Sequence, residues 1–455
     1  MTKRASRVLI IVLVCLALFV LYLLSGMSGR EARVEYTVDV RDPASGIVHV
    51  NMVMHPPSRP FVTLWLRDTN HRGLHRVEHF SVRRGSQLLP NWQTLPGFAD
   101  ARSVWTGFSQ KAVEIDYDVN PYWMKGQAPR SYLGPDFGYL RGMVVLYTPL
   151  TLKSISGMLN YIDVLDDSAG RARLQFFLPD EWTLISPWGS GELETPVAHI
   201  RNTYFGLGPM SVTTTQVGDS ALLLGVYAEL NEEQLDYGLQ DIPHLFETMG
   251  ELTGVSLHSA TPYWALTVFS DEPIHGGASG TNSLVTSDDL PTISHEMFHW
   301  WNGRTVESTP DANWIEEGFT EYYEGKALYS AGIWSSDELS EHLDKLYGRR
   351  DLEFVGIDGQ WLPINLVQAS ENLVRKGANE EYCKVYNGGA LIAYFLDQRL
   401  QMQGKSLDEI WRLLNDVNEP ISTDVFLQEL EILGGVGLAR ECEDLVHGRR
   451  AIPHP

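Results

Sequence analysis

Residues 294–303 read SHEMFHWWNG, and residues 314–324 read WIEEGFTEYYE. In the first segment His295 and His299 are four positions apart, so on a helix both imidazoles lie on one face, about one turn apart. Apolar neighbours favour that helix, and the Asn-Gly pair that follows is typical of a helix end. The second segment is predicted to be a further helix with several carboxylates. The two segments therefore predict a pair of helices that bring imidazoles and carboxylates together.

Two neutral imidazoles directed at one point suit a zinc ion, and a catalytic zinc ion commonly has three protein ligands and one open position for water. Glu296 lies between the two histidines and need not be a ligand. Its carboxylate can reach water at the metal and act as a general base. The motif thus predicts a zinc site with His295 and His299 as ligands and Glu296 as the catalytic base.

The third zinc ligand is expected on the second helix. Glu317 is the best candidate, although spacing alone leaves its neighbour Glu316 open. Glu321 and Glu324 follow Glu317 at i+4 and i+7, on the same helix face. One of them could accept a hydrogen bond from a ligand histidine and fix its tautomer, and we favour Glu321 for that role. The alternative for these carboxylates is a solvated helix face.

The length and composition of the chain indicate a globular protein of more than one domain. Its 455 residues suffice for two or three domains, and the 44% hydrophobic content argues against disorder. The formal net charge of -23 argues against a nucleic-acid partner. With three cysteines in the chain, neither a disulfide framework nor a cysteine metal site is expected. Cys383 and Cys442 are interpreted as two buried thiols, with a disulfide between them as the alternative.

The N-terminal region carries a signature of membrane attachment. Residues 8–24 are seventeen consecutive apolar positions, preceded by three basic residues. At about 1.5 Å per residue this run reaches about 25 Å, so we interpret residues 8–27 as a transmembrane anchor after a cytoplasmic tail of residues 1–7. This predicts a single-pass protein of the inner (cytoplasmic) membrane whose catalytic domain is periplasmic or extracellular. A cleaved signal peptide is the alternative, although no Ala-x-Ala site follows the run.

The part of the chain from residue 31 to 230 consists of short β-type runs separated by turns. Residues 34–40 alternate at period two, and a turn and a second alternating run at 47–54 complete a predicted hairpin. Further strands are expected at 61–66, 77–82, 113–117, 143–146, 174–177, 199–204 and 222–228. Residues 31–230 are therefore predicted to form a β-rich domain, a sandwich or an open barrel.

Helical patterning begins at residue 231 and defines the second predicted domain, residues 231–455. Apolar residues recur at helical spacing from 235 to 249 and again after the metal motif. A β run at 263–270 and a short strand at 282–286 precede the metal helix, so a small sheet is expected there. The predicted fold class is α+β, with an N-terminal membrane anchor, a sandwich-like β domain and a mostly helical catalytic domain.

A glycine-rich loop, HGGASG at 275–280, lies between these two strands. Such a loop beside a sheet edge could let an extended peptide pair with the strand, because glycines allow a close backbone approach. The candidate substrate-binding residues are Gly276, Gly277 and Ala278, and an ordinary loop is the alternative. Tyr386 opens a later helix, where its hydroxyl could stabilise the oxyanion that forms when water attacks an amide.

Together these motifs resemble those of the glycyl aminopeptidase family. The likeness rests on HEMFHWWN at 295–302 and WIEEGFTEYY at 314–323, and it extends over roughly residues 31–450. Members are gluzincin metallopeptidases, related to aminopeptidase N and thermolysin, and they often carry a PDZ domain. The resemblance implies an N-terminal β domain followed by a thermolysin-like catalytic domain. It also implies roles for five residues, as zinc ligands (His295, His299 and Glu317), general base (Glu296) and oxyanion stabiliser (Tyr386).

The chain departs from the family pattern at three places. The family's Gly-Gly loop is usually followed by an acidic residue that binds the free amine of the substrate, and Ser279 stands at that position. Gly388 replaces the lysine that follows the family's tyrosine. No PDZ module is expected, because the catalytic domain extends to the end of the sequence. The departures bear on specificity, whereas the metal ligands and the base are kept.

The leading hypothesis is a membrane-anchored, aminopeptidase-like zinc metallopeptidase in which Glu296 activates zinc-bound water to hydrolyse peptide bonds. The expected partners are a peptide or protein substrate, Zn2+ and the membrane, without nucleic acid. One alternative is a zinc-binding scaffold or regulatory protein on the same fold, which would not need Glu296. Another is an endopeptidase, or a hydrolase of a different substrate class.

Overall fold

The computed structural model describes most of the chain between residues 33 and 453. The residues in this span that it does not describe are 56–60, 68–75, 96–98, 108, 110, 122–130, 150–169, 192, 218–219, 228–231, 258–260, 270–276, 281 and 355–361. The chain divides into two compact units, Met1–Ser211 and Val212–Pro455. Each unit has its own hydrophobic core.

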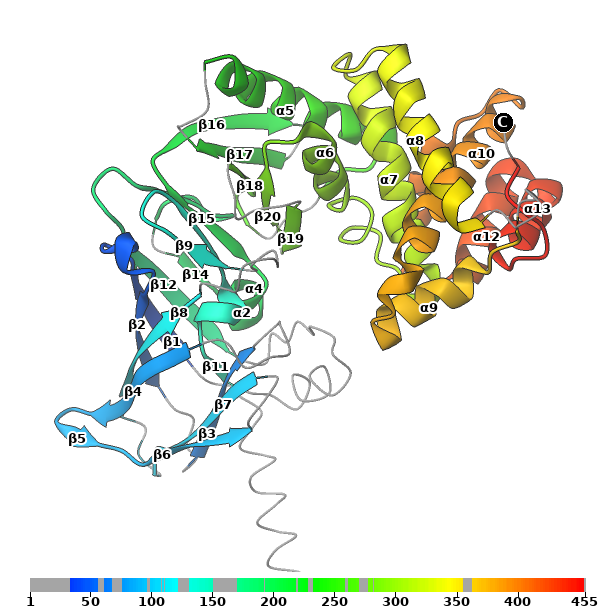
Figure 1. The fold of residues 1–455 in the computed structure, drawn as a ribbon. Helices are drawn as coiled ribbons and strands as arrows, with labels where there is room; N and C mark the ends of the chain where they lie inside the picture. The colour runs from blue at the N-terminus through cyan, green and yellow to red at the C-terminus, as the bar shows by residue number, and fades with distance from the viewer. Residues whose placement is uncertain are drawn as a thin grey trace, which may run out of the picture. The chain divides into compact units, whose positions relative to one another are not determined.

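The first unit is built from β-sheets (Figure 1). Its largest sheet has the strand order β14 (Leu193–Pro196), β12 (Arg171–Phe177), β1 (Arg33–Asp39), β2 (Val48–His55), β8 (Val113–Asn120), β4 (Arg76–Arg84) and β5 (Gln87–Leu88). Along β1 buried residues alternate with more exposed ones, because successive side chains of a strand point to opposite faces of the sheet. Two four-stranded sheets are also part of the unit. One has the order β13 (Thr183–Ile185), β15 (Tyr204–Gly208), β10 (Gly138–Arg141) and β9 (Tyr132–Leu133). The other has the order β11 (Thr148–Pro149), β3 (Phe61–Arg67), β7 (Ala99–Trp105) and β6 (Asn91–Leu95).

Two strands predicted in this unit are wrong, because short helices occupy their positions. α2 spans Gly142–Val145 and α4 spans Val197–Arg201. Every residue of α2 is buried, and an apolar run without alternation does not distinguish a strand from a helix. After α4 the Thr203 hydroxyl donates a hydrogen bond to the carbonyl of His199, so the regular strand β15 begins at Tyr204.

The second unit combines one five-stranded sheet with a set of helices. The sheet has the order β16 (Met210–Val217), β17 (Ser220–Tyr227), β18 (Trp264–Phe269), β20 (Ser283–Ser287) and β19 (Gly277–Gly280). β17, β18 and β20 run parallel, and β19 pairs antiparallel with β20 at the edge. Because β16 and β17 join this sheet, the division between the units falls earlier in the chain than the predicted boundary after residue 230.

The helices of the second unit enclose an aromatic core. They are α5 (Glu232–Thr253), α6 (Leu290–Phe298), α7 (Asn313–Ser330), α8 (Ser336–Phe354), α9 (Leu366–Lys376), α10 (Gly389–Gln401), α11 (Ile410–Asn415), α12 (Thr423–Gly434) and α13 (Val436–Val446). Trp264, Trp300, Trp314 and Trp411 are fully buried among them. Figure 1 shows α6 beside the sheet and α7 beside α8, and α6 also packs directly against α7. The predicted α+β class, β-rich first and helical second, is confirmed.

The predicted single-pass inner-membrane location is corrected. No helix in the described part of the chain is long and apolar enough to cross a membrane. Residues 8–27, on which that prediction rested, lie outside the described residues. The predicted anchor and the periplasmic or extracellular placement of the catalytic domain therefore have no structural support.

Candidate metal centre

Helix α6 begins and ends at signals that are local in the sequence. The side chain of Asp289 caps its N-terminus by accepting a hydrogen bond from the backbone N–H of Thr292 at 3.1 Å, and Pro291 occupies the first turn. The regular helix ends at Phe298, one residue before His299. His299 keeps helical angles, φ -60° and ψ -14°, so it still lies one turn from His295.

The turn after α6 is fixed to α7 by one buried amide. Asn302 donates hydrogen bonds through Nδ2 to the carbonyls of Ile315 and Glu316, at 2.8 and 2.9 Å, and to the Thr320 hydroxyl at 3.0 Å. Gly303 follows with φ +116°, and a Cβ there would lie 3.1 Å from Oε1 of Glu316. The helix ends at Phe298, before the Asn-Gly pair that the sequence pattern marked as its end, and Asn302 instead fixes the following turn to α7.

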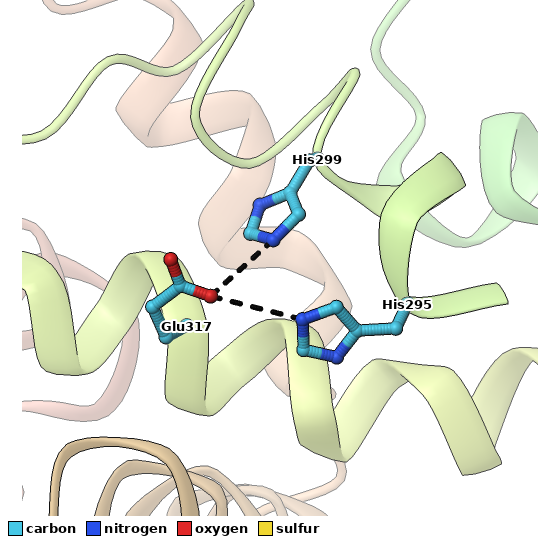
Figure 2. A group of neighbouring side chains, drawn as sticks. All are labelled: His295, His299 and Glu317. Carbon is cyan, nitrogen blue, oxygen red and sulfur yellow. Dashed lines mark ion pairs between the residues drawn. The ribbon is translucent and has the colours of Figure 1, made fainter. Parts of the chain in front are cut away.

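Three side chains from these helices meet at one point (Figure 2). Oε2 of Glu317, on α7, lies 3.7 Å from Nε2 of His295 and 3.4 Å from Nε2 of His299. Two ligand atoms about 2.0–2.1 Å from one tetrahedral zinc ion lie roughly 3.3–3.4 Å apart. The 3.4 Å separation equals such an edge and the 3.7 Å separation is about 0.3 Å longer, so both are close to those of a zinc site.

The same carboxylate oxygen supplies an independent test of the fit. Oε2 of Glu317 is buried and has no hydrogen-bond donor among the described residues. A buried charged oxygen without a partner is costly, and a cation bound there would remove that cost. Burial works to raise the pKa of Glu317, but the imidazoles of His299 and His295 lower it well below its usual value. The residues present fit a divalent cation, and the His-His-carboxylate set is typical of zinc.

The other ring nitrogen of each histidine faces an acceptor. Nδ1 of His299 lies 3.0 Å from the carbonyl of Asn302. Nδ1 of His295 lies 3.4 Å from Oε2 of Glu321 and 3.5 Å from Oε2 of Glu324. If Nδ1 carries the proton in both rings, both Nε2 atoms are free to bind a metal.

In addition to the favoured Glu321, Glu324 lies close to His295, and His342 lies close to Glu324. Glu324 is 8% exposed, and its pKa is raised by burial. Its second oxygen lies 3.8 Å from Nδ1 of His342 on α8. Glu324 was the less favoured of two helix positions in the sequence, and His342 carried no sequence signal, since it lies on a helix that only tertiary packing brings near.

Glu296 and Glu316 are both buried beside the centre, but they differ in their contacts. Burial raises the pKa of each. The Glu316 carboxylate accepts a hydrogen bond from the Ser308 hydroxyl and does not belong to the ligand cluster. For Glu296, the charges of His299 and His295 act against burial by lowering the pKa, whereas Glu317 raises it. Glu317 is therefore the carboxylate that converges with the two histidines, as the resemblance implied.

Tyr386 is brought to the centre by a close contact between two helices. It lies in a π-helical turn, η5 (Lys384–Gly388), which leads into α10. Gly389 packs against α7 so closely that a Cβ there would be 2.2 Å from the Trp314 carbonyl and 2.8 Å from Cα of Gly318. The Tyr386 ring lies parallel to that of His295, with centroids 5.9 Å apart. Burial and then Glu317 raise the pKa of Tyr386 far above its usual value.

The predicted substrate loop is described only in part. Gly276 lies outside the described residues, whereas Gly277 and Ala278 lie in β19, the edge strand of the sheet. Ala278 pairs with Val285 of β20, and α6 packs against both strands. The loop therefore includes a sheet edge next to the metal helix. Cys442 is buried, Cys383 is partly exposed, and no disulfide joins them.

The comparisons with known proteins agree with this geometry. A sequence profile of the family described as M61 glycyl aminopeptidase matches residues 288–392, which include α6, α7 and the Tyr386 turn. No curated protein sequence matches the chain.

Solved structures that resemble the chain share its fold at low sequence identity. An aminopeptidase N family protein from Idiomarina loihiensis has a TM-score of 0.72 at 15% identity, over 92% of this chain and 77% of its own. A mutant M1 zinc metallopeptidase from Deinococcus radiodurans, bound to a Tyr-Ser-Ala substrate, has a TM-score of 0.56 at 14% identity, over 94% and 97%. Native yeast LTA4 hydrolase has a TM-score of 0.54 at 12% identity, over 93% and 68%.

Proposed function

We propose that the protein is a zinc metallopeptidase that hydrolyses peptide bonds, a proposal that the match of residues 288–392 to the M61 glycyl aminopeptidase profile supports. The observation that supports this most is the convergence of two imidazole nitrogens, at 3.7 and 3.4 Å, on the buried Oε2 of Glu317, which has no hydrogen-bond donor among the described residues. His295, His299 and Glu317 would hold the metal. Zinc is the cofactor that this donor set and the family indicate.

A zinc ion in such a site supplies a Lewis acid that polarises a carbonyl and lowers the pKa of water. Residues of the chain carry out the remaining steps. Glu296 takes the proton of the attacking water and delivers it to the leaving amine. Tyr386, whose raised pKa keeps its hydroxyl protonated, donates a hydrogen bond to the developing oxyanion. Glu321 and Glu324 hold the His295 ring through its Nδ1 proton.

We further propose that the substrate is an extended peptide that pairs with the outer edge of β19, where no strand of the described residues lies. A strand at a sheet edge offers unpaired backbone groups, and residues 277–280 have small side chains or none. Ser279 offers no carboxylate for a substrate ammonium group, so we expect the preference for a free over a blocked N-terminus to be less than about tenfold.

The experiment that tests this function uses the full chain with and without zinc. After metal removal and reconstitution, we expect about one zinc per chain, together with hydrolysis of glycyl peptides that a chelator abolishes and added zinc restores. N-acetylated versions of the same peptides measure the dependence on the free amine. One equivalent of zinc without hydrolysis across a broad peptide panel would instead support the scaffold alternative. Failure to bind zinc would contradict both functions.

A further inference from the structure

Tyr382 is an aromatic residue beside the metal centre for which the mechanism above has no role. It follows the short helix η4 (Asn379–Glu381) and is 49% exposed. Its ring stacks on Tyr386, with centroids 3.9 Å apart and an interplanar angle of 20°. Tyr386 in turn lies parallel to His295, at 5.9 Å and 5°. The three rings therefore form one stack that extends from the protein surface to a metal ligand.

The two phenol groups are also linked electrostatically. Burial raises the pKa of Tyr382 and of Tyr386, and the carboxylate of Glu317 acts in the same direction on both. The ring stack brings Tyr382 into direct contact with the Tyr386 phenol, which in turn stacks on His295.

The turn that carries Tyr382 is anchored on both sides. Glu381, the preceding residue, accepts hydrogen bonds from Nζ of Lys384 at 2.5 Å and from Nδ2 of Asn372, on α9, at 3.3 Å. The backbone then continues directly into the π-helical turn of Tyr386, and π-helical turns often mark functional sites. Because its backbone is fixed in this way, the ring of Tyr382 can restrict the orientations open to Tyr386.

We propose that Tyr382 is a positioning residue for the proposed hydrolysis, which holds the Tyr386 phenol in the orientation that faces the metal centre. Its ring stacks on that of Tyr386, with centroids 3.9 Å apart. The inference rests on the proposed function, since Tyr386 stabilises the oxyanion in that mechanism. Tyr382 acts through Tyr386, and it does not contact the reacting atoms.

A double-mutant cycle tests this dependence. Tyr386→Phe should lower kcat about 100-fold or more, as loss of an oxyanion donor does. Tyr382→Phe keeps the stack but removes the hydroxyl, and should lower kcat about tenfold with KM unchanged; Tyr382→Ala should lower it further. In the Tyr386→Phe background, Tyr382→Phe should cause no additional loss. Losses that multiply, or a rise in KM alone, would overturn the proposal in favour of a direct substrate contact.

A second measurement separates this inference from the proposed function. Calorimetry with a phosphinic tripeptide, which mimics the tetrahedral intermediate, reports the same coupling without turnover. We expect weaker binding to the Tyr382→Phe variant when Tyr386 is present, and no further weakening when it is absent. If the wild type shows no hydrolysis but this coupling remains, only the proposed function fails. If the binding losses are independent, the positioning role fails.

Tyr329 offers a matched control, because it is 46% exposed and lies near the C-terminal end of α7. Tyr329→Phe should change neither kcat nor inhibitor binding. The melting temperature of each variant should stay within a few degrees of wild type, since a surface hydroxyl contributes little to stability. A Tyr329→Phe effect as large as that of Tyr382→Phe would contradict a specific role for Tyr382.

Discussion

At the scale of single residues, the metal centre depends on which nitrogen of each imidazole carries the proton. His295 has two carboxylates on its Nδ1 side, at 3.4 and 3.5 Å, where one would suffice. Glu324 is the more deeply buried of the two, and it also faces His342. This arrangement suggests that Glu321 and Glu324 both orient His295.

Substitution of either carboxylate should weaken zinc binding without abolishing it. Glu321→Gln and Glu324→Gln should each lower zinc affinity about 10–100-fold, because outer-shell acceptors fix the tautomer and basicity of a ligand histidine. Competition against a fluorescent chelator measures the affinity. Glu341→Gln, on the exposed face of α8, serves as the control. An unchanged affinity in the Glu324→Gln variant would show that Glu321 alone holds the ring.

Local sequence spacing was enough to predict that His295 and His299 come together. The four-residue spacing of His295 and His299 survives even though the regular helix ends between them. Glu316 and Glu317 are adjacent on one helix, so spacing could not separate them. The distinction depends on Ser308, which binds Glu316, and on the orientation of α7 set by Asn302. Such tertiary contacts leave little trace in a single sequence.

At the scale of secondary-structure elements, the crossing of α7 and α10 determines where Tyr386 lies. Gly389 and Gly318 allow the two backbones to approach closely. Glu317 precedes Gly318 directly, and Tyr386 lies three residues before Gly389. The contact therefore sets the separation of a metal ligand from the proposed oxyanion donor.

Gly389→Ala should destabilise the protein by about 3 kcal/mol, because its Cβ would lie 2.2 Å from the Trp314 carbonyl and the backbone cannot yield easily. Gly437→Ala on α13 is the matched control, since no atom lies within 4 Å of its Cβ. That variant should be neutral or stabilised by up to about 1 kcal/mol. Urea unfolding measures both. Equal stability of the two variants would show that the close helix contact has no energetic importance.

Behind the metal site, a buried ionic network connects α7 to α10. Asp397 is 1% exposed and accepts hydrogen bonds from Nζ of Lys326 at 2.8 Å, the Tyr322 hydroxyl at 2.6 Å and the backbone N–H of Leu407 at 2.9 Å. Nζ of Lys326 also binds Asp408 at 2.8 Å. Burial acts to raise the pKa of Asp397, but Lys326 and the hydrogen bonds lower it overall.

Asp397→Asn should therefore cost on the order of 3 kcal/mol at neutral pH, because it leaves a buried cation less well paired. The lowered folded-state pKa means that the charged form contributes stability above the unfolded pKa of about 4, and that this contribution is lost as pH falls further. Urea unfolding measures the free energy of unfolding from pH 7 to pH 3. We expect the difference between the wild type and the Asp397→Asn variant to become smaller as the pH falls. Asp344→Asn, exposed on α8, should show no difference. A difference in unfolding free energy that grows as the pH falls would contradict the role of Asp397.

Some helices and strands could not be predicted from the local sequence pattern. Residues 142–145 form a helix although their apolar sequence suggested a strand, since complete burial removes the alternation that identifies strands. The sequence of β16 and β17 has the same β-type pattern as the preceding residues, which predicts that both strands belong to the first domain. Their partner β18 follows only after the long helix α5, so the sheet to which they belong was not visible locally.

At the scale of the whole molecule, two separate hydrophobic cores predict two unfolding events. The three proposed metal ligands lie in the second unit, Val212–Pro455. Calorimetry should show two transitions, of which chelation lowers only one by several degrees. Zinc at 1,000 times its Kd stabilises the folded state by about 4 kcal/mol, and each kcal/mol shifts the Tm of a domain of this size by about 2–4 °C. A single transition, or an equal shift of both, would contradict independent units.

In the proposed mechanism Glu296 acts as a base and is not a metal ligand. The most direct test measures zinc content and peptide hydrolysis on the same preparation of the Glu296→Gln variant. We predict about one zinc per chain, as in the wild type, with hydrolysis reduced by about 10²–10⁴-fold, the contribution of a positioned proton acceptor. Hydrolysis within tenfold of wild type, with zinc bound, would contradict the role of Glu296 and the mechanism built on it.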